Sequence, residues 1–198
     1  MLVDSSRLIG YPVLSLHAEG PVARVEMELV EPESLKIVAF RVWGPEIRDD
    51  PEVGEILDAR DIREFSGIGM IVDSIDRFVN PGDVIKIDKV IGLNFSLIGL
   101  KVVTKKGTRL GKVIDFVVDT DDWTVRQLIV KRPAMKALID PELVIPRKEI
   151  LEIDDYKITV KDEEDKIRKT LRKEEFVPNF VNPFRELYFS ASRIERKK

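Results

Sequence analysis

The sequence predicts a mainly β protein made of two tandem small antiparallel barrels, followed by a short charged helix and a tail. The first observation behind this prediction is a weak internal repeat in the chain of 198 residues, in which residues 22–73 align with residues 110–161 at an offset of 88 without a gap. The second is that apolar positions in one copy match apolar positions in the other. The third is that the β-rich segments are short and separated by turn signals, as in small barrels. We expect domains at 1–90, 91–161 and 162–198.

In the first copy, three β-rich segments cover residues 12–16, 22–30 and 35–42. Glu19-Gly20-Pro21 and Pro32-Glu33-Ser34 separate them, and both combine residues that favour turns. Gly44-Pro45 then begins a connection, at the position where Arg132-Pro133 begins one in the second copy. The two copies therefore predict the same order of strands and turns.

In the second copy, residues 112–118 and 124–130 are rich in β-branched side chains and flank a polar hairpin connection at 119–122. Residues 156–161 alternate apolar and polar side chains at a period of two, which indicates a strand with one buried face. Residues 134–139 are expected to form a helical turn or two. Between the copies, residues 84–87 are predicted as a short strand, with the domain boundary near residue 90.

From residue 162 the composition changes. Acidic residues at 162–165 precede basic residues up to 173, which suits the dipole of a helix. Few apolar side chains interrupt this segment, so the helix is expected to be mostly solvated. The stretch 176–184 that follows has closely spaced prolines and fits no regular element.

Composition and charge indicate a protein of the cytoplasm. The chain has no cysteine, which excludes disulfides and thiol chemistry, and a formal net charge of −3. Residues 176–198 carry a net +3, so the rest sums to −6, which argues against direct nucleic-acid binding. The first seven residues do not resemble a signal peptide, and no apolar run is long enough for a transmembrane segment.

Few side chains are suited to chemistry. His17 is the single histidine and lies beside a predicted turn, where a surface position is the simpler explanation. The acidic pairs at 49–50, 121–122 and 154–155 also lie in predicted turns, where Asp is favoured for local hydrogen bonds. Asp119, Asp121 and Asp122 lack the Gly and the distal Glu of an EF-hand loop, so calcium binding is disfavoured. We expect no catalytic residue, no cofactor and no metal.

Aromatic side chains carry the prediction for recognition. Trp123 stands at the 119–122 hairpin, and its counterpart in the first copy is the apolar Leu35, which favours packing in the core or between domains over partner binding as its role. The tail concentrates aromatic side chains, which are costly to leave in water. Docking on the chain itself, binding to a partner and disorder all stay open for this tail. The candidate partner-binding residues are Trp123, Phe176, Phe180, Phe184, Arg185, Tyr188 and Phe189.

The stretch Leu97-Ile98-Gly99-Leu100-Lys101-Val102-Val103, with Leu110-Gly111-Lys112-Val113 and Leu143-Val144-Ile145-Pro146, resembles the PRC-barrel superfamily. It is similar to the carboxy-terminal domain of RimM-type ribosome maturation factors and to the cytoplasmic domain of the photosynthetic reaction-centre H subunit. The first copy fits through Leu8-Ile9-Gly10, which returns as Leu97-Ile98-Gly99. The whole chain looks most like uncharacterised bacterial proteins with paired PRC barrels, which implies a scaffold without enzymatic residues.

These observations predict a non-enzymatic, cytoplasmic adaptor or scaffold that binds another protein or a second copy of itself. The alternative is a ribosome-associated assembly factor related to RimM. The acidic body argues against independent RNA binding, but a protein contact on a ribosomal particle would be compatible with it.

Overall fold

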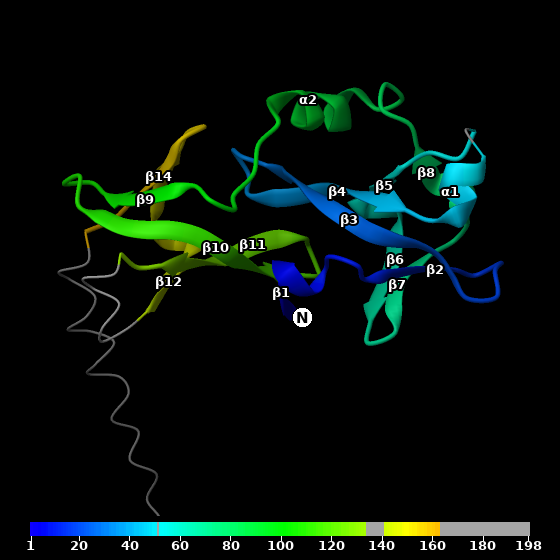
Figure 1. The fold of residues 1–198 in the computed structure, drawn as a ribbon, viewed down its shortest axis with the longest axis horizontal. Helices are drawn as coiled ribbons and strands as arrows, with labels where there is room; N and C mark the ends of the chain where they lie inside the picture. The colour runs from blue at the N-terminus through cyan, green and yellow to red at the C-terminus, as the bar shows by residue number, and fades with distance from the viewer. Residues whose placement is uncertain (51, 134–140, 163–198) are drawn as a thin grey trace, which may run out of the picture. The chain divides into compact units, whose positions relative to one another are not determined.

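The computed structural model describes residues 1–50, 52–133 and 141–162, and within them one six-stranded arrangement occurs twice (Figure 1). Repeat 1 comprises β2 (Pro12–Ser15), β3 (Pro21–Glu31), β4 (Lys36–Trp43), β5 (Ile56–Asp58), β6 (Ile62–Ser66) and β7 (Gly69–Val72). Repeat 2 comprises β9 (Lys101–Thr104), β10 (Arg109–Asp119), β11 (Thr124–Lys131), β12 (Glu142–Pro146), β13 (Ile150–Ile153) and β14 (Lys157–Val160). The strands run β6-β7-β2-β3-β4-β5 in the first and β13-β14-β9-β10-β11-β12 in the second. A mainly β fold is confirmed.

The β-bulges recur at the same offset of 88 residues as the internal repeat of the sequence. The β3–β4 pairing shifts register between Val25 and Met27, and the β10–β11 pairing shifts between Val113 and Asp115, 88 residues later. The second shift in each of these pairs, and the shifts in β2–β3 and β6–β7, also return in repeat 2. Bulges bend and twist the strand that carries them. The two copies are therefore bent at matching points, although few of their residues are identical.

Two closed antiparallel barrels are not confirmed. The sheet order among the described residues is an open path, and β2–β7 and β9–β14 pair in parallel. The two ends of the repeat 1 order, β5 and β6, follow each other along the chain through a 3-10 turn at Ala59–Asp61 without pairing. The 3-10 turn Arg147–Glu149 occupies the same place in repeat 2. Each repeat thus curves through its bulges and turns, and among the described residues no hydrogen-bonded pairing joins the two end strands of its order.

The repeats join where β4 and β11 begin, in an arrangement with local twofold pseudo-symmetry. Lys36 and Thr124 lie opposite each other in an antiparallel pair. The backbone N–H of Ile37 donates to the Trp123 carbonyl at 2.8 Å, and the N–H of Val125 donates to the Leu35 carbonyl at 2.8 Å. Leu35 and Trp123 both have positive φ, +51° and +54°. Residues 88 apart therefore exchange equivalent hydrogen bonds, as in the interface of a symmetric dimer.

The segment that precedes each repeat packs on the other repeat. The strand β1 (Leu2–Asp4) pairs with β10 of repeat 2. The helix α2 (Ile85–Leu93) precedes repeat 2 and lies over β3 and β4 of repeat 1 (Figure 1). Residues 84–87 are therefore not a strand, and the prediction was wrong. Ile87, Val90 and Ile91 follow the i, i+3, i+4 spacing of a helix, and the first two are buried against repeat 1.

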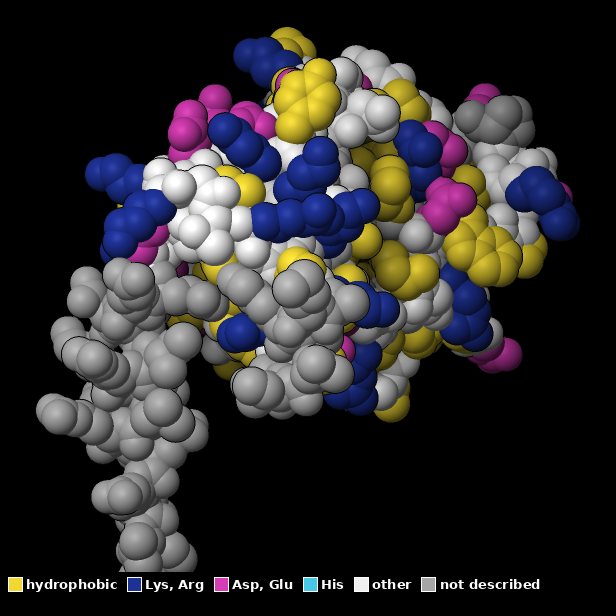
Figure 2. All heavy atoms as spheres, turned by 60° about the vertical axis from the view of Figure 1, so that its left-hand side comes forward, with side chains coloured by type: hydrophobic (Ala, Val, Ile, Leu, Met, Phe, Trp, Pro, Cys, Tyr) yellow, Lys and Arg dark blue, Asp and Glu magenta, His cyan; other side chains and the backbone are white. Residues whose placement is uncertain are grey.

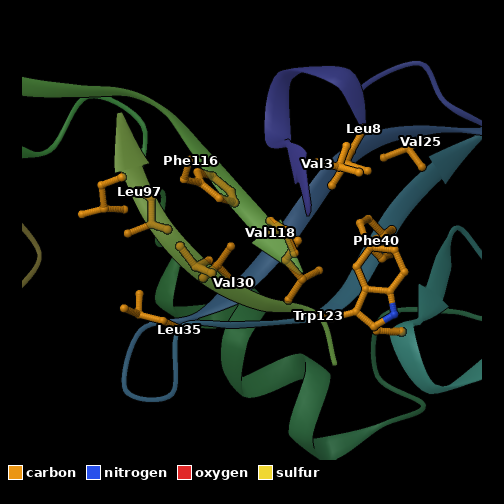
Figure 3. Packing of buried hydrophobic residues seen from close by; sticks show 14 of the residues in the cluster. Val3, Leu8, Val25, Val30, Leu35, Phe40, Leu97, Phe116, Val118 and Trp123 are labelled. Carbon is orange, nitrogen blue, oxygen red and sulfur yellow. The ribbon is translucent and has the colours of Figure 1, made fainter. Parts of the chain in front are cut away.

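One apolar cluster includes buried side chains from both repeats. It contains Phe40 and Val25 from repeat 1 together with Phe116 and Leu128 from repeat 2, each 1% exposed or less. Figure 3 shows Trp123 of repeat 2 against Phe40 of repeat 1 in this cluster. Residues Met1–Asp162 accordingly form one compact unit.

The remaining elements are short: β8 (Phe78–Val79), α1 (Pro45–Asp49) and two 3-10 turns at Ser5–Arg7 and Ile75–Arg77. The predicted helical turn at 134–139 lies outside the described residues, as do all but Asp162 of the predicted domain 162–198. None of the helices in the described part of the chain has the length and apolar character that a membrane span needs. The division at residue 90 stays a prediction.

Candidate functional site

A pocket of about 760 Å³ lies at the junction of the two repeats. Its walls come from the start of β4, the turn and strand at 58–65, the first turn of α2 and the hairpin between β10 and β11. The residues that line it are Lys36, Ile37, Val38, Asp58, Ala59, Arg60, Ile62, Arg63, Glu64, Phe65, Lys86, Ile87, Thr120, Asp121, Asp122 and Trp123. The volume is in the range of pockets that bind ligands.

Trp123 forms the aromatic floor of this junction. Its indole is 8% exposed and meets Phe40 edge to face, with ring centroids 4.9 Å apart. It also meets Phe65 at 5.8 Å, and Phe65 in turn stacks on Tyr11 at 5.0 Å. Edge-to-face and offset pairs are the geometries that aromatic rings prefer. The sequence therefore pointed to a residue of the pocket, and packing between the repeats is also part of its role.

Charges of both signs surround the apolar floor. Arg60 holds Asp58 with side-chain hydrogen bonds of 2.6 Å from Nη2 and of 3.0 and 3.2 Å from Nε. Burial would raise the pKa of Asp58, but these bonds and one from the Arg60 backbone hold the pKa below its usual value. The Asp58 carboxylate consequently stays ionised and bound, which makes it a poor general acid or base.

The acidic hairpin that lines one side of the pocket is paired with Arg126 and with the amino group of Met1, which lies 2.9 Å from Asp121. Arg126 donates to Asp119 at 2.9 Å and to Asp122 at 2.9 Å. The hydrogen bond from Arg126 is the main reason that the pKa of Asp119 is lowered. The described residues contain no group of three or more His, Asp or Glu side chains placed to hold a metal ion.

The other residues that the sequence analysis considered for function lie either on the surface or outside the described residues. His17 lies exposed in the turn after β2 and does not line the pocket. Phe176, Phe180, Phe184, Arg185, Tyr188 and Phe189 lie outside the described residues. Sequence reasoning missed Phe65, Lys36 and the turn at 58–60. These residues line the pocket only because the two repeats contact each other. The one sign of that contact in the sequence was the alignment of Leu35 with Trp123.

One partly buried carboxylate lies away from the pocket. Glu28 faces Phe40 in the β3–β4 register and occupies the position that buried Phe116 has in repeat 2. Burial raises the pKa of Glu28, and Oε2 is buried with no hydrogen-bond partner among the described residues. A carboxylate in such a place is easier to bury when protonated.

We expect Glu28→Gln to raise the free energy of unfolding by about 1 kcal/mol at pH 7, because it removes a poorly solvated charge. The folded-state pKa of Glu28 lies above its unfolded value, so the penalty is full above the folded pKa and vanishes below the unfolded one. Urea unfolding at pH 7 and pH 3.5 checks this. An equal gain at both values would contradict the proposed charge effect.

Residues 94–167 match the PRC-barrel domain family. The match spans all six strands of repeat 2, from β9 to β14. The chain therefore contains a PRC-barrel domain, as the resemblance in the sequence predicted for this part. A comparison of the chain with curated proteins found no match.

Proposed function

We propose that this chain is a non-enzymatic, cytoplasmic adaptor that pairs two PRC-barrel-like repeats and binds a segment of a partner protein in the pocket at their junction. Repeat 1 shares the strand order and the bulge positions of the matched domain in repeat 2, which supports a tandem origin. The observation that carries the proposal is an aromatic floor with a charged rim, built from both repeats.

The composition of the pocket suits protein recognition. Binding energy at protein interfaces concentrates in a few well-packed residues, and tryptophan and arginine are enriched among them. Trp123 provides such an anchor, while Arg63 and Glu64 on the rim are exposed. Rim charges select a partner mainly through complementarity. A partner segment would place an apolar side chain against the floor and polar groups at the rim.

The chemistry of the pocket supports binding more than catalysis. The ionised Asp58 is already bound to Arg60, and the single histidine of the chain is elsewhere. General acid–base catalysis needs a group that can exchange a proton near neutral pH. The lining residues supply charges and an apolar surface, which are the requirements of a docking site.

Substitution of Trp123 by leucine tests the proposal. We expect affinity capture from native lysate to recover a partner with the wild-type chain, and at least about tenfold less with Trp123→Leu, because a buried aromatic anchor is lost. Leucine occupies the equivalent position 35 with the same positive φ, so the backbone at 123 can accept it. Circular dichroism verifies that the variant is folded.

The matched control is Trp43→Leu, which changes the only other tryptophan, an exposed side chain outside the pocket. The control should recover as much partner as the wild type. A chain that ends at Glu175 tests in parallel whether the aromatic tail contributes. Equal recovery by all the variants would show that the pocket does not bind the partner.

A further inference from the structure

Four lysines lie in a row across repeat 2, on four neighbouring strands. Lys157 of β14 is opposite Lys101 of β9, Lys101 is opposite Lys112 of β10, and Lys112 is opposite Lys131 of β11. All four are exposed. Residues directly opposite on adjacent strands point to the same face. With strands about 4.8 Å apart, the row is about 14 Å long.

The four lysines destabilise the folded state, because like charges directly opposite each other destabilise a sheet. Among the described residues, no carboxylate lies within ion-pair distance of Lys101, Lys112 or Lys131. Lys157 has Asp154 at 3.8 Å. The fold does not require this row, since repeat 1 has Pro12, Arg24 and Trp43 where repeat 2 has Lys101, Lys112 and Lys131.

A shallow hollow of about 420 Å³ adjoins the row. Lys112, Lys131 and Arg109 line it together with Ile98 and Ile114, whose side chains are 43% and 39% exposed. The face turned forward in Figure 2, which carries β9 and β14, shows lysine and arginine side chains gathered with apolar ones between them. The surface thus combines the positive charge of Lys101, Lys112 and Lys131 with an apolar recess.

Repeat 2 has more basic than acidic side chains, whereas repeat 1 has the reverse. Residues 91–161 hold 13 basic and 10 acidic side chains, whereas residues 1–90 hold 10 basic and 18 acidic ones. At physiological ionic strength charges more than about 8 Å apart are largely screened. An anionic group at the row therefore responds mainly to the lysines and hardly to the acidic repeat.

We propose that the lysine row binds a short acidic segment of a partner protein. Acidic residues flank the row, because Glu142 lies opposite Lys131 and Asp154 lies beside Lys157. A long polyanion that continued along the row would meet carboxylates at both ends. In an extended segment, three acidic residues at alternate positions point to the same face and span about 13 Å, which matches the row, while the residues between them point away from the sheet.

This surface is separate from the junction pocket, although the inference rests on the proposed role in protein binding. The probe is the synthetic peptide Gly-Gly-Glu-Ser-Glu-Ser-Glu-Gly-Gly, titrated into the ¹⁵N-labelled full chain and followed by NMR chemical shifts. We expect shifts concentrated in β9, β10, β11 and β14, and binding at least about tenfold tighter than that of the same peptide with glutamine in place of glutamate.

Charge reversal tests the row directly. The triple variant Lys101→Glu, Lys112→Glu, Lys131→Glu should weaken peptide binding by at least about tenfold, because it replaces three attractions with repulsions. The control Lys89→Glu, Lys105→Glu, Lys148→Glu has the same net charge outside the row and should stay within about twofold of wild type. Trp123→Leu should also bind the peptide as the wild type does.

Equal weakening by the row and control variants would overturn the proposal, because it would reflect net charge alone. Binding of a nine-nucleotide oligouridylate or of phosphatidylserine vesicles through the row, without binding of the acidic peptide, would overturn it as well. Failure of the peptide titration while Trp123 still governs partner capture would remove this inference and leave the proposed function standing. The milder variant Lys112→Thr removes one charge of the row. It should raise the midpoint of urea unfolding and weaken binding of the peptide, so a loss of binding would not reflect a loss of folding.

Discussion

Phe40→Ala is expected to lower the free energy of unfolding of residues 1–162 by about 4 kcal/mol, the usual range for a fully buried phenylalanine. The Phe40 side chain is 0% exposed and belongs to the cluster that includes core residues of both repeats. Its ring also supports Trp123 of repeat 2 at 4.9 Å. The substitution therefore opens a cavity and removes an aromatic contact across the junction.

Urea unfolding followed by circular dichroism measures this loss. Phe40→Leu is the matched control, because repeat 2 has Leu128 at the equivalent position, and we expect it to cost only about 1 kcal/mol. Since the core is shared, Phe40→Ala should shift a single transition and leave no stable remnant of repeat 2. Two separate transitions, with only the first one shifted, would show that the repeats unfold independently.

Asp115→Ala is expected to cost about 2 kcal/mol, because hydrogen bonds to a charged group are lost and a buried hydroxyl is left without its acceptor. Asp115 accepts from the Ser5 hydroxyl at 2.7 Å, from the Ser6 hydroxyl, and from the backbone N–H groups of Ser6 and Phe116. Ser5 is 3% exposed. The carboxylate therefore anchors the chain just after β1 to the bulge in β10.

The same carboxylate gives a pH dependence. Burial opposes ionisation of Asp115, but the hydrogen bonds from Ser6 and Ser5 outweigh it and lower the pKa. A lowered folded-state pKa stabilises the fold above the unfolded pKa of about 3.9, and this contribution is lost as the pH falls through the folded-state value. The difference between wild type and Asp115→Ala should accordingly be full at pH 7 and shrink below pH 4.

Unfolding measured at pH 7 and pH 3 checks this expectation. Asp155→Ala serves as the control, since Asp155 is an exposed turn residue, and it should change stability by less than about 0.5 kcal/mol at either pH. A loss for Asp115→Ala that is the same at both pH values would mean that packing, not the charged hydrogen bonds, holds the segment.

Local patterns predicted the four longest strands, β3, β4, β10 and β11, together with β2 and β14, because these patterns depend on neighbouring residues. The segments expected at 12–16, 22–30 and 35–42 became β2, β3 and β4, and the alternating residues 156–161 contain β14. The pattern failed at 84–87, where four mostly apolar residues do not distinguish a strand from a helix. The helical spacing of Ile87, Val90 and Ile91 extends beyond that short window, and burial against repeat 1 makes it decisive.

The candidate site was harder to predict. Trp123 stood out because it is a rare aromatic residue in a hairpin, and the alignment with Leu35 suggested contact between the copies. The partners of Trp123 could not be predicted, since Phe40 and Phe65 come from a different repeat and lie far away in the sequence. The aromatic residues of the tail stay a prediction, because they lie outside the described residues.

The sequence by itself determined the duplicated order of strands and turns, because hairpins and alternation arise from residues close together in the chain. Tertiary structure alone decided which distant residues meet. The exchanged hydrogen bonds of Leu35 and Trp123, the crossing of β1 to β10 and the open form of the sheet depend on long-range pairing. The lysine row depends on it too, since Lys157 reaches Lys101 only through the parallel register of β14 and β9. A shift of one residue in that register would send the side chains to the opposite face.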